Sequence, residues 1–326
     1  MKAIQVTQFG GSEKLVYTDV EDIIAGKGEV CVRLYTAGVN PSDTYTLTGT
    51  YSFNIPQLPY TPGLDGAGIV EAVGDGVTNV CVGDRVFISS LMQSKSTGTF
   101  AEKIVCDANS VHPLPNNVSF EQGAALGVPA LTAYRALFHR ASLKPGQTVL
   151  IHGASGGVGL QVVQMAKSHG ANVIGTASKP KGKKMVQQAG ADMVIDHVTE
   201  ASIDDVLALT NGKGPDVIIE FLANRNLETD LKLIAPFGKI VIVGNRGSIE
   251  INPRLAMQKE CDILATALWN APKDEYEQSI NGVVDMLKSG ALQPIIGTTL
   301  PLEQAPQAFE QLAKGIGNGK LVLKIN

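Results

Sequence analysis

A glycine-rich turn between residues 148 and 159 carries the clearest chemical signal in the sequence. An apolar run, 148–151, leads into the turn, and a helical stretch follows it. Ala154, Gly156 and Gly159 occupy the three glycine positions of a G-x-G-x-x-G pattern. Small residues at this spacing let backbone N–H groups approach a pyrophosphate at the start of a helix. With a strand before it and a helix after it, the pattern predicts dinucleotide binding rather than a structural turn.

The charge near the end of the next strand indicates which dinucleotide binds. NAD sites place an acid there, whereas NADP sites place basic or small polar groups around the 2′-phosphate. Residues 122 to 191 contain eight Lys or Arg and no acid, so the rest of a chain of net charge −4 totals −12 (−4 − 8). We expect at least half of these basic residues to form a solvated face.

The positive field of this stretch favours a ligand with several phosphate charges. The sequence therefore predicts NADPH rather than NADH. Ser178 and Lys179 are the first candidates for the 2′-phosphate, with Lys183 and His197 as further candidates.

Composition limits the other classes of function. The chain has 326 residues, a pI near 5.8 and four scattered cysteines without a CxxC pair. It shows no signal-peptide core and no apolar run near the ~20 residues that span a bilayer. We expect a cytoplasmic protein that does not enter membranes, and its acidity argues against nucleic acid as the main partner.

The expected fold class is α/β, and the hydrophobic pattern divides the chain into two parts. Short apolar alternations in the first third predict a partly open β-barrel. Six strand-like runs then alternate with helical stretches, which predicts a doubly wound parallel sheet. The final segment is too small to fold alone. The expected domains are residues 1–122, completed by 292–326, and residues 123–291.

Segments from residue 37 to the C-terminus resemble a known family. They are residues 37–45, 49–51, 58–63, 83–86, 131–137, 152–159, 221–224, 243–247, 250–254 and 319–320. Together they resemble the medium-chain dehydrogenase/reductase superfamily, and more narrowly its zeta-crystallin-like NADPH:quinone oxidoreductases. The resemblance implies a GroES-like catalytic barrel, a Rossmann domain and an active site in the cleft between them. It also implies NADPH as hydride donor, a quinone as acceptor and a homodimer.

Zinc-dependent members of this superfamily carry a cysteine where this chain has Asn40, and Gly-His-Glu where it has Gly63-Leu64-Asp65. Asn and Leu are poor zinc ligands, the cysteines are too scattered for a structural site, and the five histidines are dispersed. We therefore expect no metal. Without one, alcohol oxidation lacks its usual means of acidifying the hydroxyl, whereas reduction of a quinone or conjugated carbonyl stays feasible.

Several polar residues are candidates for the substrate site. Asn40 can donate through its amide, and Tyr45 and Tyr51 offer a phenolic O–H and a flat apolar face, although simple packing explains Tyr45 equally well. Asp43 either orients a neighbour or caps a turn. By resemblance, the Thr132 hydroxyl points at the nicotinamide.

Residues at the carboxyl ends of parallel strands are candidates for the cofactor site. His152, which opens the turn, is expected to be a hydrogen-bonded structural residue, and Leu268 and Trp269 either wall the pocket or meet another subunit. Lys320 is assigned to the cofactor phosphates by resemblance only. The full expected cofactor set is Ala154, Ser155, Gly156, Gly157, Val158, Gly159, Ser178, Lys179, Lys183, His197, Leu222, Asn224, Asn245, Arg246, Leu268, Trp269 and Lys320.

Two alternatives to a quinone oxidoreductase stay open. A zinc-free reductase of enone or 2-alkenal double bonds would share every cofactor residue and differ only in its acceptor pocket. A non-catalytic RNA-binding or crystallin-type protein is the other. The acidity of the chain and the absence of an RNP-like aromatic pattern argue against RNA binding as the main role.

Overall fold

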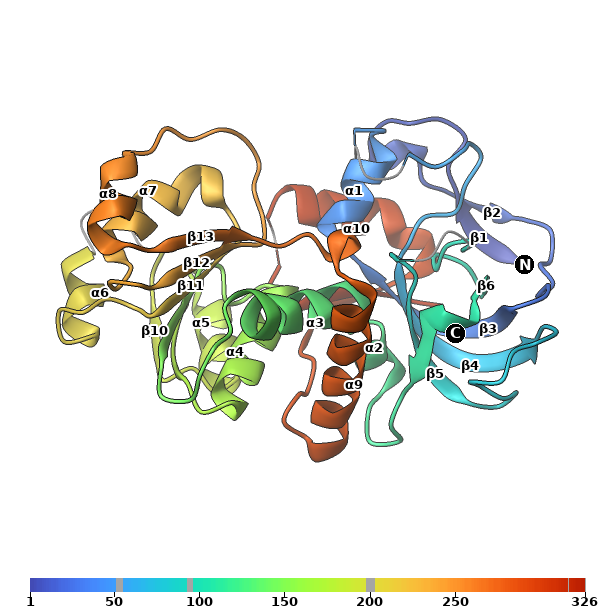
Figure 1. Ribbon diagram of the computed structural model, residues 1–326. Coiled ribbons are helices and arrows are strands. Elements are labelled where there is room, and N and C mark those ends of the chain that lie inside the picture. The colour runs from blue at the N-terminus through green and yellow to red at the C-terminus, as the bar shows by residue number, and fades with distance from the viewer. Residues whose placement is uncertain (51–54, 93–95, 198–202, 316, 326) are drawn as a thin grey trace. The chain divides into compact units, whose positions relative to one another are not determined.

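The computed structural model describes residues 1–50, 55–92, 96–197, 203–315 and 317–325 (Figure 1). The chain forms two compact units, Met1–Pro129 with Gln293–Asn326, and Ala130–Leu292. The division falls later than the expected boundary at residue 122. The reason is local, because the Val128 backbone N–H donates to Asp65 Oδ1 at 2.8 Å and so fixes the start of a helix in the first unit.

The first unit is built on a mostly antiparallel sheet, whose seven strands within the described residues follow the order β14-β15-β3-β4-β5-β7, with β6 also paired to β3. Their bounds are Glu29–Val39 (β3), Asp65–Val73 (β4), Arg85–Ser89 (β5), Lys103–Asp107 (β6), Val111–Pro113 (β7), Ile296–Pro301 (β14) and Lys320–Lys324 (β15). A small antiparallel pair, Lys2–Gln5 (β1) and Val16–Asp19 (β2), and the helices Pro41–Leu47 (α1), Phe120–Gly123 (α2) and Ala305–Ala313 (α10) complete the unit.

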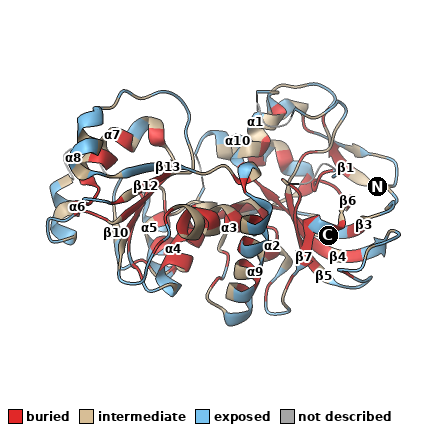
Figure 2. Ribbon diagram, viewed as in Figure 1, coloured by how far each residue is buried: buried red, intermediate tan, exposed pale blue. Residues whose placement is uncertain are grey.

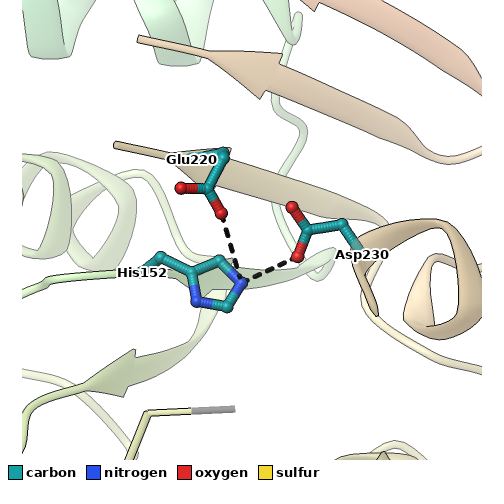
Figure 3. Close-up of side chains that lie close together, drawn as sticks. All are labelled: His152, Glu220 and Asp230. Atoms are coloured by element: carbon teal, nitrogen blue, oxygen red, sulfur yellow. Dashed lines mark hydrogen bonds and ion pairs between the residues drawn. The ribbon is translucent and has the colours of Figure 1, made fainter. Parts of the chain in front are cut away.

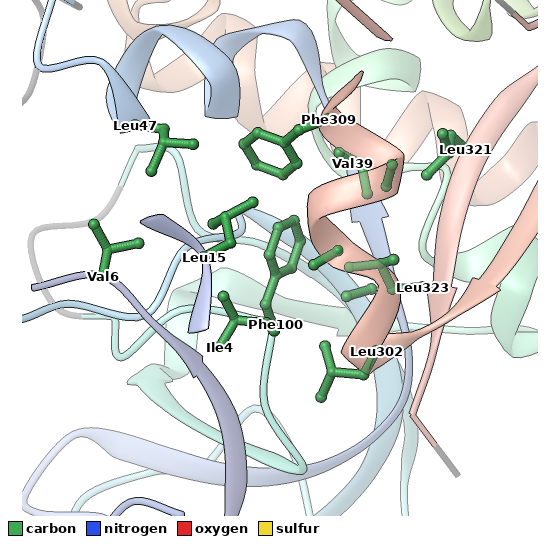
Figure 4. Packing of buried hydrophobic residues seen from close by; sticks show 13 residues of the cluster. Ile4, Val6, Leu15, Val39, Leu47, Phe100, Leu302, Phe309, Leu321 and Leu323 are labelled. Atoms are coloured by element: carbon green, nitrogen blue, oxygen red, sulfur yellow. The ribbon is translucent and has the colours of Figure 1, made fainter. Parts of the chain in front are cut away.

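The C-terminal segment is part of the first unit because it supplies both a strand and a core face. β15 pairs antiparallel with β3, with Leu321 opposite Val39. Phe309 of α10 meets Phe100 edge to face, with ring centroids 6.1 Å apart, inside a cluster of fully or almost fully buried apolar side chains (Figure 4). Burying a side chain of this size contributes roughly 1.5–3 kcal/mol, so the returning tail stabilises the barrel.

The second unit is a parallel sheet whose six strands within the described residues run in the order β10-β9-β8-β11-β12-β13. Relative to chain order this is 3-2-1-4-5-6, the doubly wound arrangement expected from the sequence. The strands are Thr148–Ile151 (β8), Asn172–Thr176 (β9), Met193–Ile195 (β10), Val217–Glu220 (β11), Lys239–Ile242 (β12) and Asp262–Ala265 (β13). The helices are Gly127–Tyr134 (α3), which starts in the first unit, and Gly157–Ser168 (α4), Pro180–Gln188 (α5), Ile203–Leu209 (α6), Ala223–Leu233 (α7), Pro253–Lys259 (α8) and Lys273–Ser289 (α9).

Burial follows position in this sheet. All four residues of the central strand β11 are buried, whereas three of the four in the edge strand β13 are exposed (Figure 2). The strand order reverses between β8 and β11, and ligands of doubly wound sheets bind at the carboxyl ends of the strands beside such a reversal. Among the described helices, none combines the length and apolar character needed to cross a membrane.

Replacing Phe309 with alanine tests the contribution of the returning tail. The change Phe309→Ala removes a 3% exposed ring that contacts Phe100, so it should lower the free energy of unfolding by about 3–5 kcal/mol. Urea unfolding followed by circular dichroism measures the loss. The 74% exposed Met257 provides the control, and Met257→Ala should change the same quantity by less than about 0.5 kcal/mol. Equal effects of the two variants would contradict the assigned core.

Candidate dinucleotide site and catalytic loop

The glycine-rich turn is fixed to the end of β9 by two hydrogen bonds. The Gly153 N–H donates to Thr176 Oγ1 and the Ala154 N–H donates to the Thr176 carbonyl oxygen, both at 3.0 Å. Gly153 has a φ of +55°, a left-handed conformation that favours glycine. α4 then begins at Gly157, and the first N–H groups of a helix have no partners within the helix. The turn therefore presents backbone donors at a helix start, as pyrophosphate binding requires.

Small residues are needed where the sequence places them. A Cβ atom at Gly159 would lie 2.7 Å from the Gly153 carbonyl oxygen, so any side chain there would push α4 away from the turn. The first glycine position of the pattern holds the fully buried Ala154, and its methyl group fits because Gly175 on β9 lacks a side chain. A Cβ at Gly175 would lie 3.0 Å from that methyl carbon. The turn thus keeps the close approach on which dinucleotide binding depends.

The end of β9 presents Ser178 and Lys179, which are both exposed, and Lys179 directly precedes α5. Lys183, a further candidate for the 2′-phosphate, forms an ion pair with Asp196 at 3.0 Å, and His197 is exposed nearby in the sequence. Ser178 and Lys179 are therefore the better placed of the predicted residues.

Half of the eight basic residues in the acid-free stretch have protein partners. Arg135 and Lys167 pair with Glu275 and Asp192, Lys183 pairs with Asp196, and Arg140 donates to the Ala265 carbonyl oxygen. The net charge of residues 122–191 is therefore larger than the positive charge that a bound ligand would contact. The exposed Lys179, Lys181 and Lys184 are the basic side chains at the start of α5.

Hydrogen bonds bring together the candidates that follow β11 and β12. The Asn224 N–H donates to Asn245 Oδ1 and the Arg246 N–H donates to Asn224 Oδ1, both at 3.0 Å. Both loops lie at the carboxyl edge of the sheet, as predicted. Leu222 is half-buried directly before α7. Leu268 is buried and Trp269 half-buried in a short helical turn after β13, and Thr132 is half-buried on α3.

In the first unit, three buried side chains form a charged network that includes the substrate-site candidate Asn40. Lys320 Nζ donates to Asn40 Oδ1 at 2.5 Å and lies 3.5 Å from Asp65 Oδ2, while Asn40 Nδ2 donates to the same Asp65 oxygen at 2.7 Å. All three residues are less than 5% exposed. The structure thus holds the Lys320 ammonium on two oxygens of its own unit, rather than in the exposed position that a phosphate contact from the tail would suggest.

Asp43 lies at the start of α1, where its carboxylate accepts a hydrogen bond from the Asn40 N–H at 2.7 Å. It is therefore the cap that the sequence allowed as one alternative. Burial, reinforced by the charge of Asp65, raises the pKa of Asp43 to about 7. Burial also lowers the pKa of Lys320, against the opposing attraction of Asp65 and Asp43. Burial removes water from these groups and so disfavours the ionised form of each one. An ionised side chain in the network therefore needs a partner of opposite charge or a hydrogen bond.

Sequence reasoning missed two features of the sites. It named Asp65 only as the last residue of the Gly63-Leu64-Asp65 segment and did not identify it as the partner of Asn40 and Lys320. It also treated His152 alone, whereas the structure brings His152 next to Glu220 and Asp230. Tyr45 is 36% exposed on α1, and the predicted Tyr51 lies outside the described residues.

Comparison with known proteins agrees with this geometry. Residues 26–116 match the family described as alcohol dehydrogenase GroES-like domain, and residues 157–285 match the family described as zinc-binding dehydrogenase. These two domains, with the barrel, the doubly wound sheet and the glycine-rich turn, define a medium-chain dehydrogenase/reductase. The quinone oxidoreductase of Rattus norvegicus is 46% identical over 325 residues, covering 99% of this chain and 97% of that protein. The chain therefore belongs to the quinone oxidoreductase family of this superfamily, which confirms the resemblance and the expected fold class.

Solved structures share the whole fold. Escherichia coli quinone oxidoreductase complexed with NADPH has a TM-score of 0.87 and 29% identity, covering 99% of this chain and 100% of that one. A structure described as an NAD-dependent alcohol dehydrogenase has a TM-score of 0.92 and 28% identity, with both chains fully covered. Proteins described with different coenzymes thus share this fold, so coenzyme choice has to be argued from the residues of the site.

Replacing Asp43 with asparagine tests the buried network through pH. Because the pKa of Asp43 is raised to about 7, the stability this group contributes is fully present below its unfolded pKa of 3.8 and is lost as pH rises through about 7. Asp43→Asn keeps an oxygen for the Asn40 N–H but cannot ionise. Between pH 4 and pH 8 the variant should therefore gain roughly 4 kcal/mol relative to the original chain. Urea unfolding at several pH values measures the difference, and parallel stability profiles would contradict the assignment.

Proposed function

We propose that this protein catalyses the NADPH-dependent reduction of quinones by hydride transfer, without zinc. The observation that carries the proposal is the glycine-rich turn at the start of α4, tied to Thr176, the last residue of β9, after which Ser178 and Lys179 are exposed. Membership in a family whose relatives are named quinone oxidoreductases supports the acceptor. The complex of the Escherichia coli relative with NADPH supports the coenzyme.

The charges near the end of β9 support NADPH over NADH. An NAD site needs a carboxylate there for the ribose hydroxyls, but the nearest acids along the chain already have partners. Asp192 binds Lys167 at 2.5 Å and the Val173 N–H at 2.8 Å, and Asp196 pairs with Lys183. Exposed lysine and serine side chains at this edge instead suit a 2′-phosphate.

The buried network of the first unit supports a zinc-free reaction. At the positions that align with zinc ligands, Asn40 has its amide oxygen on Lys320 and its amide nitrogen on Asp65. The Asp65 carboxylate in turn accepts from the Val128 N–H as well. A buried ammonium beside these groups would repel a divalent cation, and neither position 40 nor position 64 supplies a good zinc ligand.

The reaction needs few groups of this chain. NADPH, when bound, supplies the hydride, and the protein has to align the acceptor and stabilise the oxyanion that develops on it. The Asn40 amide has a second N–H besides the one given to Asp65, and Tyr45 has a phenolic O–H. We assign these two groups, with Tyr51 and Thr132, to the substrate and nicotinamide side of the site.

We further propose a cytoplasmic homodimer. β13 is the edge of the parallel sheet, and edge strands offer unpaired backbone groups to a second chain. The four cysteines, all within the described residues, are free thiols, as in proteins of a reducing compartment.

Reversing the charge of Lys179 tests the coenzyme assignment. Lys179→Glu should weaken NADPH binding by roughly tenfold to a hundredfold and leave NADH binding nearly unchanged, because only NADPH places a phosphate beside this position. Fluorescence titration with both nucleotides measures the ratio. Lys144→Glu, the same charge change at another exposed lysine of the unit, is the matched control and should leave the ratio unchanged. Equal losses for NADPH and NADH in Lys179→Glu would show that the 2′-phosphate site is misplaced.

Two further expectations are tested on the purified protein, namely the preference for quinones as acceptor and the independence of activity from zinc. Initial rates with NADPH should be higher with quinones than with 2-alkenals, and chelators should leave those rates unchanged because no step depends on zinc. Elemental analysis should find less than stoichiometric zinc. Strong alkenal reduction beside negligible quinone turnover would favour the double-bond reductase, and loss of activity with chelator would overturn the zinc-free reaction.

A further inference from the structure

A second cluster of buried ionisable groups lies in the doubly wound unit. His152 directly follows β8, Glu220 is the last residue of β11, and Asp230 lies on α7 (Figure 3). His152 Nε2 is 2.9 Å from Asp230 Oδ1 and 3.7 Å from Glu220 Oε2. The side chains are 4%, 0% and 0% exposed for His152, Glu220 and Asp230. Burying ionisable side chains costs free energy. Three of them buried side by side therefore indicate a role beyond packing.

The cluster lies where the sheet order reverses, directly before the glycine-rich turn. The His152 backbone N–H donates to the Ile219 carbonyl oxygen on β11 at 3.0 Å. The Glu220 carboxylate accepts hydrogen bonds from the Leu222 N–H, just before α7, and from Asn226 Nδ2. The three side chains therefore connect the residue that opens the turn with the end of β11 and with α7.

This connection completes the support of the turn. On the side of β9 the turn is held by Thr176, through the N–H groups of Gly153 and Ala154. On the side of β11 it is held by the backbone and side chain of His152. The same cluster fixes Leu222 and thus the loop in which Asn224 meets Asn245 and Arg246. Both ends of an extended dinucleotide would depend on these two loops.

We propose that His152, Glu220 and Asp230 are positioning residues for the dinucleotide, which hold the glycine-rich turn and the start of α7 in the binding geometry and whose charge acts on the pyrophosphate. This inference rests on the proposed function. The three residues act through the backbone they support. A change in them should therefore affect NADPH and NADH equally, unlike a change at Lys179.

The charge of the cluster gives this role a pH signature. Burial and the neighbouring Asp230 charge raise the pKa of Glu220 to about 7, with His152 opposing them. Burial disfavours the His152 cation, but Asp230 and Glu220 outweigh it and raise the pKa of His152. Among the described residues, the charges that shift the pKa values of His152 and Glu220 are those of the three cluster members themselves, and Leu222 and Asn226 contribute neutral donors to Glu220. As Glu220 ionises, a further negative charge is added to the cluster beside the turn, which should weaken binding of a pyrophosphate.

The same three residues could in principle hold a metal ion, since their ligand atoms lie within 4.8 Å of one another. Two observations favour the hydrogen-bonded arrangement. His152 Nε2 is already at hydrogen-bond distance from Asp230, and Glu220 is already engaged by Leu222 and Asn226. A bound metal at these residues is therefore one of the results that would contradict the proposal in the experiment below.

The experiment uses the full chain and near-isosteric variants that remove charge. NADH is the main probe, because it carries the pyrophosphate but no 2′-phosphate that titrates near neutral pH. Its dissociation constant, measured by fluorescence between pH 6 and pH 8.5, should rise roughly threefold to tenfold for the original chain. Glu220→Gln should bind NADH with the same constant across this range, close to the pH 6 value of the original chain.

His152→Gln should weaken NADH and NADPH by a similar factor of roughly ten, leaving the ratio between the two nucleotides unchanged. Glu275→Gln is the matched control, because it removes the ion pair with Arg135 in the same unit without touching the cluster. It should alter thermal stability but neither nucleotide affinity nor its pH dependence. Thermal unfolding of every variant identifies any that fail to fold.

Three results would overturn the inference. The first is a Glu220→Gln variant that keeps the pH dependence of the original chain. The second is a folded His152→Gln variant with unchanged affinity for both nucleotides. The third is a stoichiometric metal that is present in the original chain and absent from His152→Gln. If the original chain bound neither nucleotide, the proposed function would fall as well, whereas normal binding with unaffected variants overturns this inference alone.

Discussion

The approach of α4 to the ends of β8 and β9 is the constraint on which the nucleotide site depends. Gly159 lies so close to the Gly153 carbonyl that a single added carbon would come within 2.7 Å of it. Gly175 makes the matching space for the Ala154 methyl group from the facing strand. Because these contacts join the first helix to the first two strands of the sheet, they determine where the helix start points. The donors for a pyrophosphate are therefore a consequence of packing as much as of composition.

Buried charge follows one rule in both units of the molecule. In the first unit the Lys320 ammonium has Asn40 and Asp65 as partners, and in the second the His152 ring has Asp230 and Glu220. In each case an extra carboxyl group has its pKa raised to about 7, Asp43 in one network and Glu220 in the other. A buried site tolerates a second negative charge poorly when it holds one cation. Burial therefore favours the protonated form of one carboxyl group in each network.

What the sequence could predict depended on how local the signal was. The turn at residues 153–159 and the absence of acids after β9 are read within about 40 residues, and the strand–helix alternation is a local pattern that repeats along the chain. The fold class that this alternation indicated is confirmed, and so is the family that the resemblance of longer segments indicated. The contact of Lys320 with Asn40 is different, because the two residues are 280 positions apart. It is set by the register of β15 on β3, where Leu321 faces Val39, and no spacing in the sequence encodes that register. Counting charges also could not distinguish Lys183, held by Asp196, from the exposed Lys179.

The register of β15 on β3 also determines which polar groups meet Asn40 in the first unit. Because Leu321 pairs with Val39, the residue before it and the residue after Val39 are brought to the same end of the strand pair, and these are Lys320 and Asn40. Asp65, the first residue of β4, pairs with Gly38 on the other side of β3, so its carboxylate reaches the same point. The Lys320 ammonium thus lies beside Asp65, the residue that aligns with the glutamate of the Gly-His-Glu segment, and it supplies positive charge there through the chain itself. Such a cation cannot coordinate an alcohol oxygen as a metal ion does, which supports the proposed reduction of an acceptor that is already electrophilic.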